Sequence, residues 1–432
     1  MTATLPSADD PRVLLALPDD VLLERIQQQT VRFFWEGAER ASGLAPDRRQ
    51  REPGPMDDDA RVATGGSGFG VMALIVAVER GWIVRDAAIE RFDRMLAVLT
   101  RAQRHHGAFP HFLHGHTGET IPFWGMDDGG DLVETALLFQ GLLCMREYLD
   151  RDDPREASIR SRITALWETV EWDWYTQGRD VLYWHWSPNH AFAINHAIHG
   201  WNECLIAYVL AAGAGSHRID PQVYHRGFAS GPDFRNGKAY FGTRLPLGMP
   251  FGGPLFFAHY SFCGLDPRGL RDDYADYWDL CQRHVRINRA HCVVNPHGHT
   301  GYDERCWGLT ASDDPGGYDA HAPANDNGTI SPTAALASLP YAPVEVMEAA
   351  RGMLGRHGTR VWGRFGFVDA FNESRKWFAN SFLAIDQGPI VVMAENHRSG
   401  LLWRLFMRAP EVREGLRRLG FSSPHLDPEA GP

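Results

Sequence analysis

Apolar residues recur along the chain at the spacing of α-helices, with short polar breaks between them. The stretches 21–41 and 85–104 have a single apolar face, which is typical of amphipathic helices at a surface. The stretches 68–83 and 132–149 are apolar nearly all round, which is typical of helices buried on more than one side. Strand signals are few and short, and they lie near residues 182, 239 and 366. The pattern predicts a mainly helical protein.

The other helical signals continue this alternation between nearly all-apolar and amphipathic stretches. They lie at 154–173, 190–213, 253–264, 271–291, 331–338, 343–356, 387–398 and 399–418. In an α/α toroid the inner helices are covered on both sides and the outer helices on one, which produces such an alternation. We therefore predict an all-α toroid formed by residues 19–420 as a single domain, with an N-terminal extension (1–18) and a C-terminal tail (421–432). Long loops rich in Trp, His, Gly and Asp are expected to form a cleft at one end.

The composition is that of a globular protein with a sizeable core, since 44% of the 432 residues are hydrophobic. The 43 basic residues against 54 acidic ones give a net charge of −11, without any basic run. This balance argues against a nucleic-acid partner. The six cysteines are scattered without a CxxC pair, so we expect most of them to be reduced and buried. No apolar run reaches the length of a membrane span, so no membrane partner is expected.

The N-terminal segment, MTATLPSADDPRVLLALPDD, carries acids where a signal peptide needs basic residues. Its apolar run, VLLAL, is too short for the core of such a peptide. As it stands, the sequence predicts a cytoplasmic protein, whereas removal of a leader would imply a periplasmic or secreted one.

Carboxylates crowd the start of one buried helical stretch, at Asp127, Asp128, Asp131 and Glu134. Helix capping accounts for one or two of them, because Asp at a helix start accepts backbone N–H bonds and meets the positive end of the dipole. The excess of acid beside Trp124 suits a site that binds a sugar by stacking and by hydrogen bonds to its hydroxyls. The 14 tryptophans of the chain fit the same hypothesis.

Several long motifs stand out along nearly the whole chain: ATGGSGFGVMALIVAVERGWI, GMDDGGDLVETALLFQGLL, SPNHAFAINHAIHGWNECLIAYVLAAG, GGPLFFAHYSFCGLD, VDAFN and IDQGPIVVMAENHRSGLLW. In this order they resemble the glycoamylase-like proteins of the endo-β-1,2-glucanase type, glycoside hydrolase family 144. The resemblance implies an (α/α)6 barrel whose long loops form the substrate cleft. It also implies endo-acting, anomer-inverting hydrolysis of linear β-1,2-glucan to sophoro-oligosaccharides, in most members outside the cytoplasm.

By the same resemblance, the family's acidic cluster maps onto Asp127, Asp131 and Glu134, and two further acids map onto Glu203 and Asp369. Inverting hydrolysis needs one carboxyl that protonates the leaving oxygen and another that activates water. Glu203 lies in a predicted apolar helix, where desolvation would raise its pKa and keep it protonated as the general acid. Its structural alternative is a buried Glu that is hydrogen-bonded to a nearby histidine.

Asp369 lies in a Gly-flanked loop, GFVDAFN, and is predicted to be exposed enough to stay ionised as the base. Its structural alternative is an Asx-turn. Asp386 competes with Asp369 for the role of base, although an Asp just before a helix is most simply an N-cap. The remaining residues predicted to contact the substrate, besides the 127–134 acids, are Trp124, Trp186, His190, His199 and Asp386.

A metal site is an alternative reading of the predicted helix 190–213. His196, His199 and Glu203 are i, i+3 and i+7 on it, close to His190. That spacing is not HExxH, and histidines also serve as hydroxyl partners in a sugar cleft, so we predict neither a metal nor a cofactor.

Three further functions remain open from sequence. The chain could be an exo-acting or a transglycosylating enzyme on the same glucan, or a non-catalytic protein that binds glucan or takes part in an assembly. The presence of both Glu203 and Asp369 favours an enzyme.

Overall fold

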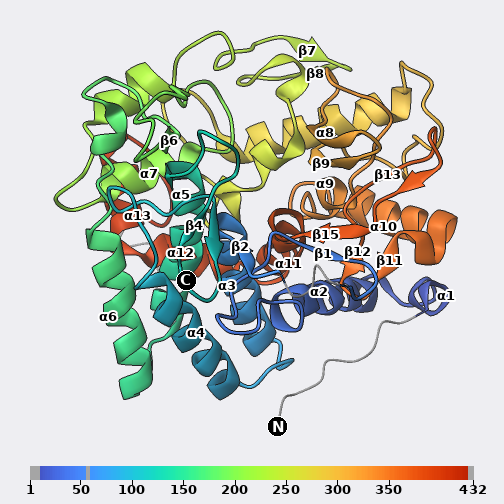
Figure 1. The fold of residues 1–432 in the computed structure, drawn as a ribbon. Coiled ribbons are helices and arrows are strands. Elements are labelled where there is room, and N and C mark those ends of the chain that lie inside the picture. The colour runs from blue at the N-terminus through green and yellow to red at the C-terminus, as the bar shows by residue number, and fades with distance from the viewer. Residues whose placement is uncertain (1–9, 55–58, 427–432) are drawn as a thin grey trace.

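The computed structural model describes residues 10–54 and 59–426 and is mainly helical (Figure 1). Residues 1–9 of the predicted extension and 427–432 of the predicted tail lie outside the described residues. The α-helices are α1 (Pro11–Leu14), α2 (Asp19–Trp35), α3 (Thr64–Glu79), α4 (Arg85–Leu99), α5 (Leu132–Tyr148), α6 (Pro154–Glu168), α7 (Leu205–Gly213), α8 (Tyr277–Val294), α9 (Pro332–Leu336), α10 (Pro343–His357), α11 (Ala384–Arg398), α12 (Leu401–Arg408) and α13 (Pro410–Arg418).

Short strands pair between the helices, mostly as two-stranded antiparallel ladders. They are β1 (Arg48–Gln50), β2 (Arg61–Ala63), β3 (Phe112–His114), β4 (Thr120–Ile121), β5 (Gly130–Asp131), β6 (His185–Trp186), β7 (Ala239–Tyr240), β8 (Thr243–Arg244), β9 (Ala311–Asp314), β10 (Gly317–Ala320), β11 (Trp362–Gly363), β12 (Gly366–Phe367), β13 (Phe371–Asn372), β14 (Trp377–Phe378) and β15 (Ser381–Leu383). Single-turn helices of other types are η2 (Trp174–Thr176), η3 (Val223–Phe228), η4 (Pro250–Gly252), η5 (Leu255–Ala258), η6 (Ser261–Cys263) and η7 (Gly358–Arg360).

The helices that are apolar nearly all round form the interior of the molecule. Both α3 and α5 are buried along almost their whole length, and they pack against each other. Helix α11 also packs against α3, α7 packs against α5, and α9 packs against α11. In Figure 1, α3, α5 and α11 lie in the middle of the view, and the amphipathic α6 and α10 lie at opposite edges. The predicted division into all-apolar and amphipathic helices is confirmed.

Helices α3 and α5 approach each other through Gly68 and Gly141. A Cβ atom built at Gly141 would lie 2.1 Å from the carbonyl oxygen of Gly68. A Cβ atom at Gly68 would likewise lie 2.1 Å from the carbonyl oxygen of Leu137. Since these neighbours are backbone atoms, only glycine permits this spacing of the two helices.

Gly141→Ala is therefore expected to destabilise the protein by ~1–3 kcal/mol, because the added methyl must push the two backbones apart. Alanine has the higher helix propensity, by about 1 kcal/mol, so propensity alone predicts the opposite sign. Urea unfolding measures the change. The control is Gly215→Ala, an exposed loop site with nothing within 4 Å of the added Cβ, where the change should stay within about 0.5 kcal/mol. A Gly141→Ala variant as stable as wild type would contradict this account of the packing.

The helix predicted over 190–213 is wrong in its first half, since α7 begins only at Leu205. Residues 190–204 form turns instead, with left-handed backbone at Ala191 (φ 50°), Asn195 (φ 51°) and Gly200 (φ 81°). Asn and Gly tolerate this region, which ends a right-handed helix. The apolar spacing of the segment therefore reflects a loop packed on the core.

The helix predicted over 253–264 is also wrong, since the 3-10 turns η5 and η6 replace it. Gly253 has φ 80° and Pro254 follows it, which prevents a longer helix from entering this segment. The side-chain amide of Gln140, from α5, donates to the carbonyls of Tyr260 and Ser261. A side chain thus satisfies backbone groups that an α-helix would pair internally.

The apolar stretch 399–418 forms two helices, α12 and α13, because Pro410 cannot continue the first. Helix α12 packs against α5 and α11, and α13 packs against α7. The described part of the predicted tail is also attached to the protein. Ser422 pairs with Arg271 through the backbone, and Nε2 of His425 lies 2.9 Å from a carboxylate oxygen of Asp266.

All six cysteines are free thiols and buried, as predicted. In the described part of the chain, no helix combines the length and the apolar character that crossing a bilayer requires.

Candidate active site

A cavity of about 510 Å³ opens among the loops that precede the interior helices. The first turns of α3, α5 and α11 contribute Gly66, Glu134 and Ile385 to its wall. The other lining residues are Asp47, Arg48, Arg61, Ala63, His111, Phe112, Phe123, Val133, Leu137, Trp184, Glu203, Phe256, Tyr260, Ala311, Tyr318 and Leu383.

Asp131 is fully buried next to the cavity and is the N-cap of α5. Its Oδ1 accepts the backbone N–H groups of Val133 and Glu134, at 3.0 and 2.9 Å. Its Oδ2 lies 3.1 Å from Nδ1 of His111 and accepts Nε1–H of Trp184 at 3.0 Å. Both oxygens are thus occupied, and Asp131 fixes two side chains of the cavity wall.

Glu134 lines the cavity from the first turn of α5. Its Oε2 accepts the backbone N–H of Gly65 at 2.6 Å. Burial raises the pKa of Glu134 to about 7, with a contribution from the charge of Asp131. His111 opposes this rise. Burial lowers the pKa of His111, but Glu134 and Asp131 outweigh it and raise that pKa to about 9, so this imidazole is a cation at neutral pH.

Glu203 lines the same cavity and is 8% exposed. Burial raises its pKa to about 7, as predicted, although Glu203 precedes α7 and does not lie inside a helix. The structural alternative, a bond to His196 or His199, is not seen: Glu203 accepts a hydrogen bond from the side chain of Cys204 instead, and both histidines are exposed. Burial of Glu203 therefore favours the protonated form of its carboxyl group, as a general acid requires.

Asp369 was expected to be exposed, and this expectation is wrong: its side chain is buried, with 2% exposed. The backbone N–H of Asp313 donates to its Oδ2 at 2.7 Å, and its carbonyl accepts from Ser331 Oγ. Burial raises the pKa of Asp369 to about 7, and the neighbouring Asp313 adds to the rise. The flanking glycines suggested an exposed loop around Asp369, but strand β9 covers this loop.

Asp386 was interpreted as an N-cap, which is also wrong. It lies inside the first turn of α11, and the N-cap residue is Leu383. The carboxyl is buried beside that of Asp369, and burial together with Asp369 holds its pKa well above the usual range. The two acids thus form a pair that retains a proton. Neither contributes to the lining of the cavity, although Leu383 and Ile385 on either side of α11's start do.

The other acids of the predicted cluster contact neighbouring loops. Oδ1 of Asp127 lies 3.2 Å from Nε2 of His185. Asp128 accepts from the hydroxyl of Ser187 and, at 2.6 Å, from the amide of Asn189. Asp128 therefore ties the 187–190 loop to the start of α5.

The predicted aromatic and histidine contacts lie outside the lining of this cavity. Trp124 is 48% exposed on the loop before α5, and His190 and His199 are exposed as well. Trp186 is half-buried and packs edge-on against His106. Phe123, next to Trp124, does line the cavity, and its ring packs 4.5 Å from that of His111.

Sequence reasoning missed several residues of the wall: His111, Arg48, Arg61, Tyr260 and Tyr318. They come from separate segments that only the fold brings together. The His- and aromatic-rich loop around His111 was visible as composition, but nothing in the sequence indicated its bond to Asp131.

The metal site considered on one helix face does not form, because residues 190–204 are not helical. Among the described residues, three groups bring possible ligand atoms within 4.8 Å of one another. They are His111, Asp127 and Asp131; His291, His297 and Asp326; and Cys306, His357 and Glu373. The first group borders the cavity, where the contact between His111 and Asp131 already occupies both residues.

Comparison with known proteins places this geometry in a family. Residues 195–410, half of the chain, match the Glycoamylase family model. The solved structure of the endo-β-1,2-glucanase from Chitinophaga pinensis, a sophorotriose and glucose complex, is 48% identical at a TM-score of 0.92. The alignment covers 95% of this chain and 100% of that one. The chain belongs to the Glycoamylase family. The resemblance carried by the sequence motifs is thereby confirmed.

A curated sequence and a solved structure from Parabacteroides distasonis show the same similarity. The exo β-1,2-glucooligosaccharide sophorohydrolase (non-reducing end) is 44% identical over 425 residues, covering 93% of this chain. The chain spans 58% of the length of that curated relative. The crystal structure of the β-1,2-glucanase is 43% identical at a TM-score of 0.90, covering 94% of this chain and 60% of the other. These named members of the Glycoamylase family are glycoside hydrolases.

Proposed function

We propose that this Glycoamylase-family chain is a glycoside hydrolase that cleaves linear β-1,2-glucan at internal linkages, with inversion, and releases sophoro-oligosaccharides. The observation that carries the proposal is a cavity with two buried carboxyls, Glu134 and Glu203, each with a pKa raised to about 7. Carboxyls tuned to neutral pH suit the acid and base steps of glycoside hydrolysis. The names of the relatives support β-1,2-glucan as the substrate class.

In the proposed reaction, protonated Glu203 gives its proton to the glycosidic oxygen as the bond to the anomeric carbon breaks. A water molecule attacks that carbon from the opposite face, and a second carboxylate accepts its proton. Two residues compete for the second role. Asp369 is indicated by the family resemblance, and Glu134 by its place on the cavity wall. We favour Glu134, because His111 holds a positive charge beside it and favours its ionised form.

We further propose that the helices form six inner and outer pairs, as in an (α/α)6 barrel. Five pairs are supported by an amphipathic helix followed by a mostly buried one: α2 with α3, α4 with α5, α6 with α7, α8 with α9, and α10 with α11. The remaining pair would be the fourth in chain order, between α7 and α8. There, η3 would replace the outer helix, and the turns η5 and η6 would replace the inner one. This pairing would position the loops of the cavity at one end of the barrel.

A digest of linear β-1,2-glucan, followed over time by thin-layer chromatography, tests the proposal. Endo action produces a range of oligosaccharides from the start, whereas exo action, which the name of one relative favours, releases sophorose from a polymer that stays long. Products longer than a supplied sophoro-oligosaccharide would indicate transglycosylation. A polymer that is bound but never shortened would overturn the hydrolase in favour of a binding protein.

The pH profile of kcat/KM is expected to be a narrow bell centred near pH 7. Glu203 must be protonated to act, and it loses its proton above its pKa of about 7. Glu134 must be ionised to act, and it is neutral below its pKa of about 7. The rate should therefore fall about tenfold per pH unit on each side. A profile that stays flat from about pH 6 to about pH 9 would contradict these two roles.

A further inference from the structure

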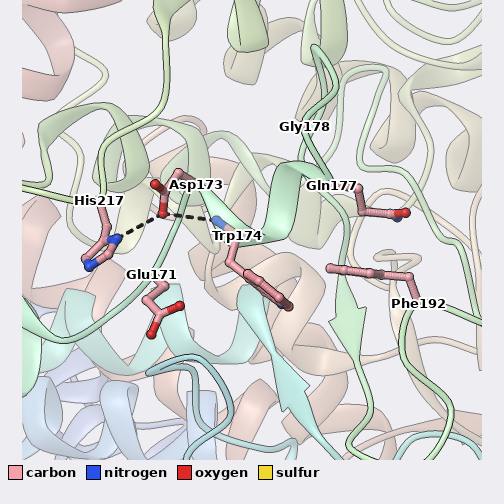
Figure 2. Close-up of a pocket in the computed structure, with 7 residues that line it drawn as sticks. All are labelled: Glu171, Asp173, Trp174, Gln177, Gly178, Phe192 and His217. Carbon is pink, nitrogen blue, oxygen red and sulfur yellow. Dashed lines mark hydrogen bonds and ion pairs between the residues drawn. The ribbon is translucent and has the colours of Figure 1, made fainter.

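A second pocket, of about 370 Å³, lies on the surface near the single-turn helix η2 (Figure 2). Its lining consists of Glu171, Asp173, Trp174, Gln177, Gly178, Phe192 and His217, none of which lines the central cavity. We propose that this pocket is a distal subsite that binds glucose units of the β-1,2-glucan chain outside the cavity. The inference rests on the proposed function, whose substrate it extends.

Trp174 is the aromatic platform of the distal subsite. Its side chain is 42% exposed, yet it is held firmly in place. The ring of His106 stacks on it at 3.7 Å with an interplanar angle of 12°, and Nδ1 of His106 lies 2.9 Å from Oε2 of Glu171. The ring of Trp186 packs against it edge-on. The rest of the indole faces the pocket, where it can stack on the C–H face of a pyranose without loss of side-chain entropy.

Acceptors for sugar hydroxyls flank this platform. Asp173 uses Oδ1 for both the backbone N–H of Trp174, at 3.0 Å, and Nδ1 of His217, at 3.1 Å. Within the described residues, Oδ2 of Asp173 and Oε1 of Glu171 make no hydrogen bond. Figure 2 shows these polar groups on one side of Trp174 and Phe192 on the other. An aromatic surface with adjacent acceptors is what a polyol with an apolar face requires.

The distal subsite and the cavity share one structural support. Trp184 lines the cavity, and two residues further on, Trp186 pairs with Gly130 in the ladder of β5 and β6. The same Trp186 contacts Trp174. Phe192, on the far wall of the pocket, belongs to the loop that follows. Trp184 of the cavity wall and Trp186, which supports the pocket, are thus only two residues apart, and this proximity makes a glucan bound in the cavity the fitting occupant of the pocket.

A distal subsite contributes binding only to chains long enough to reach it. Trp174→Ala should raise KM for long β-1,2-glucan about tenfold, the loss typical of an aromatic stacking contact. It should leave kcat for the polymer and both constants for sophorotriose near those of wild type. Trp174→Tyr retains a stacking surface and should restore most of the affinity. The control is Val344→Ala, which truncates a 66% exposed side chain at the start of α10.

Equal KM values for wild type and Trp174→Ala on the polymer would overturn the distal subsite. A matching loss on sophorotriose would also overturn it, since it would indicate a disturbance passed through Trp186 to the cavity. Binding of tetramethylammonium but not of glucan, measured by calorimetry and lost in Trp174→Ala, would also overturn it, because a pocket of aromatic rings and carboxylates also suits an organic cation. If wild type leaves the polymer intact, the proposed function fails separately. Glucan affinity by calorimetry then decides the subsite: a loss in Trp174→Ala supports it, and no change overturns it.

Discussion

Glu203→Gln is expected to lower the turnover of β-1,2-glucan by ~10²–10⁴-fold, the usual loss when general acid catalysis is removed. The amide keeps the shape of the carboxyl, so substrate affinity should change little. Glu203 lies on the cavity wall, and burial raises its pKa to about 7, so it retains a proton to donate. The amide has none. Steady-state kinetics on the polymer and calorimetric binding measure the two effects separately.

Stability distinguishes catalysis from a structural role for Glu203. Its folded pKa is raised from 4.5 to about 7, so the folded state binds the proton more tightly than the unfolded state. The resulting stabilisation is fully present below about pH 4.5 and is lost as the pH rises through 7. At pH 8, burial of the charged group costs wild type on the order of 3 kcal/mol. Glu203→Gln should therefore be at least as stable as wild type at that pH, and a fully active but destabilised variant would end the assignment.

The helices could be predicted from the sequence because they depend on the periodicity of apolar residues, which is a local property. Residues 64–79 are apolar on every side, and the structure buries nearly all of them. The helix predictions were wrong where the backbone angles of single residues end a helix. Ala191 adopts a left-handed backbone conformation in the stretch 190–204. The sequence does not predict this, because alanine normally favours the right-handed helix.

The residues of the candidate site also divide into those that the sequence predicted and those that it could not. Glu134 was identified from the excess of acids at the start of an apolar stretch, and Glu203 from the family resemblance together with its apolar surroundings. The burial of Asp369 could not be predicted, because its cover comes from Asp313, 56 residues earlier in the chain. His111 was missed for a similar reason, since its bond to Asp131 joins two loops. Long-range contacts of this kind leave no mark on a local pattern.

The second large effect is expected from Glu134→Gln. This substitution should lower turnover by ~10²–10⁴-fold if Glu134 is the base. Oε2 of Glu134 accepts from Gly65 N–H, and Glu134 lines the cavity proposed to hold the substrate. The base must be ionised, and the cationic His111 favours that state. Asp369 does not line the cavity, and it is buried in a pair with Asp386 that retains a proton.

Asp369→Asn should accordingly lower turnover by less than about tenfold, a smaller loss than removal of a general base causes. It should also stabilise the protein above about pH 7, because it removes a carboxyl whose ionisation is opposed by burial and by its neighbours. Asp386→Asn is the matched control, since it relieves the same pair from the other side and should behave alike. Turnover, KM and melting temperature measured on these variants at about pH 6 and about pH 8 separate the two carboxyls. If Asp369→Asn abolishes turnover at unchanged KM, while Glu134→Gln raises KM alone, Asp369 is the base and Glu134 a substrate contact.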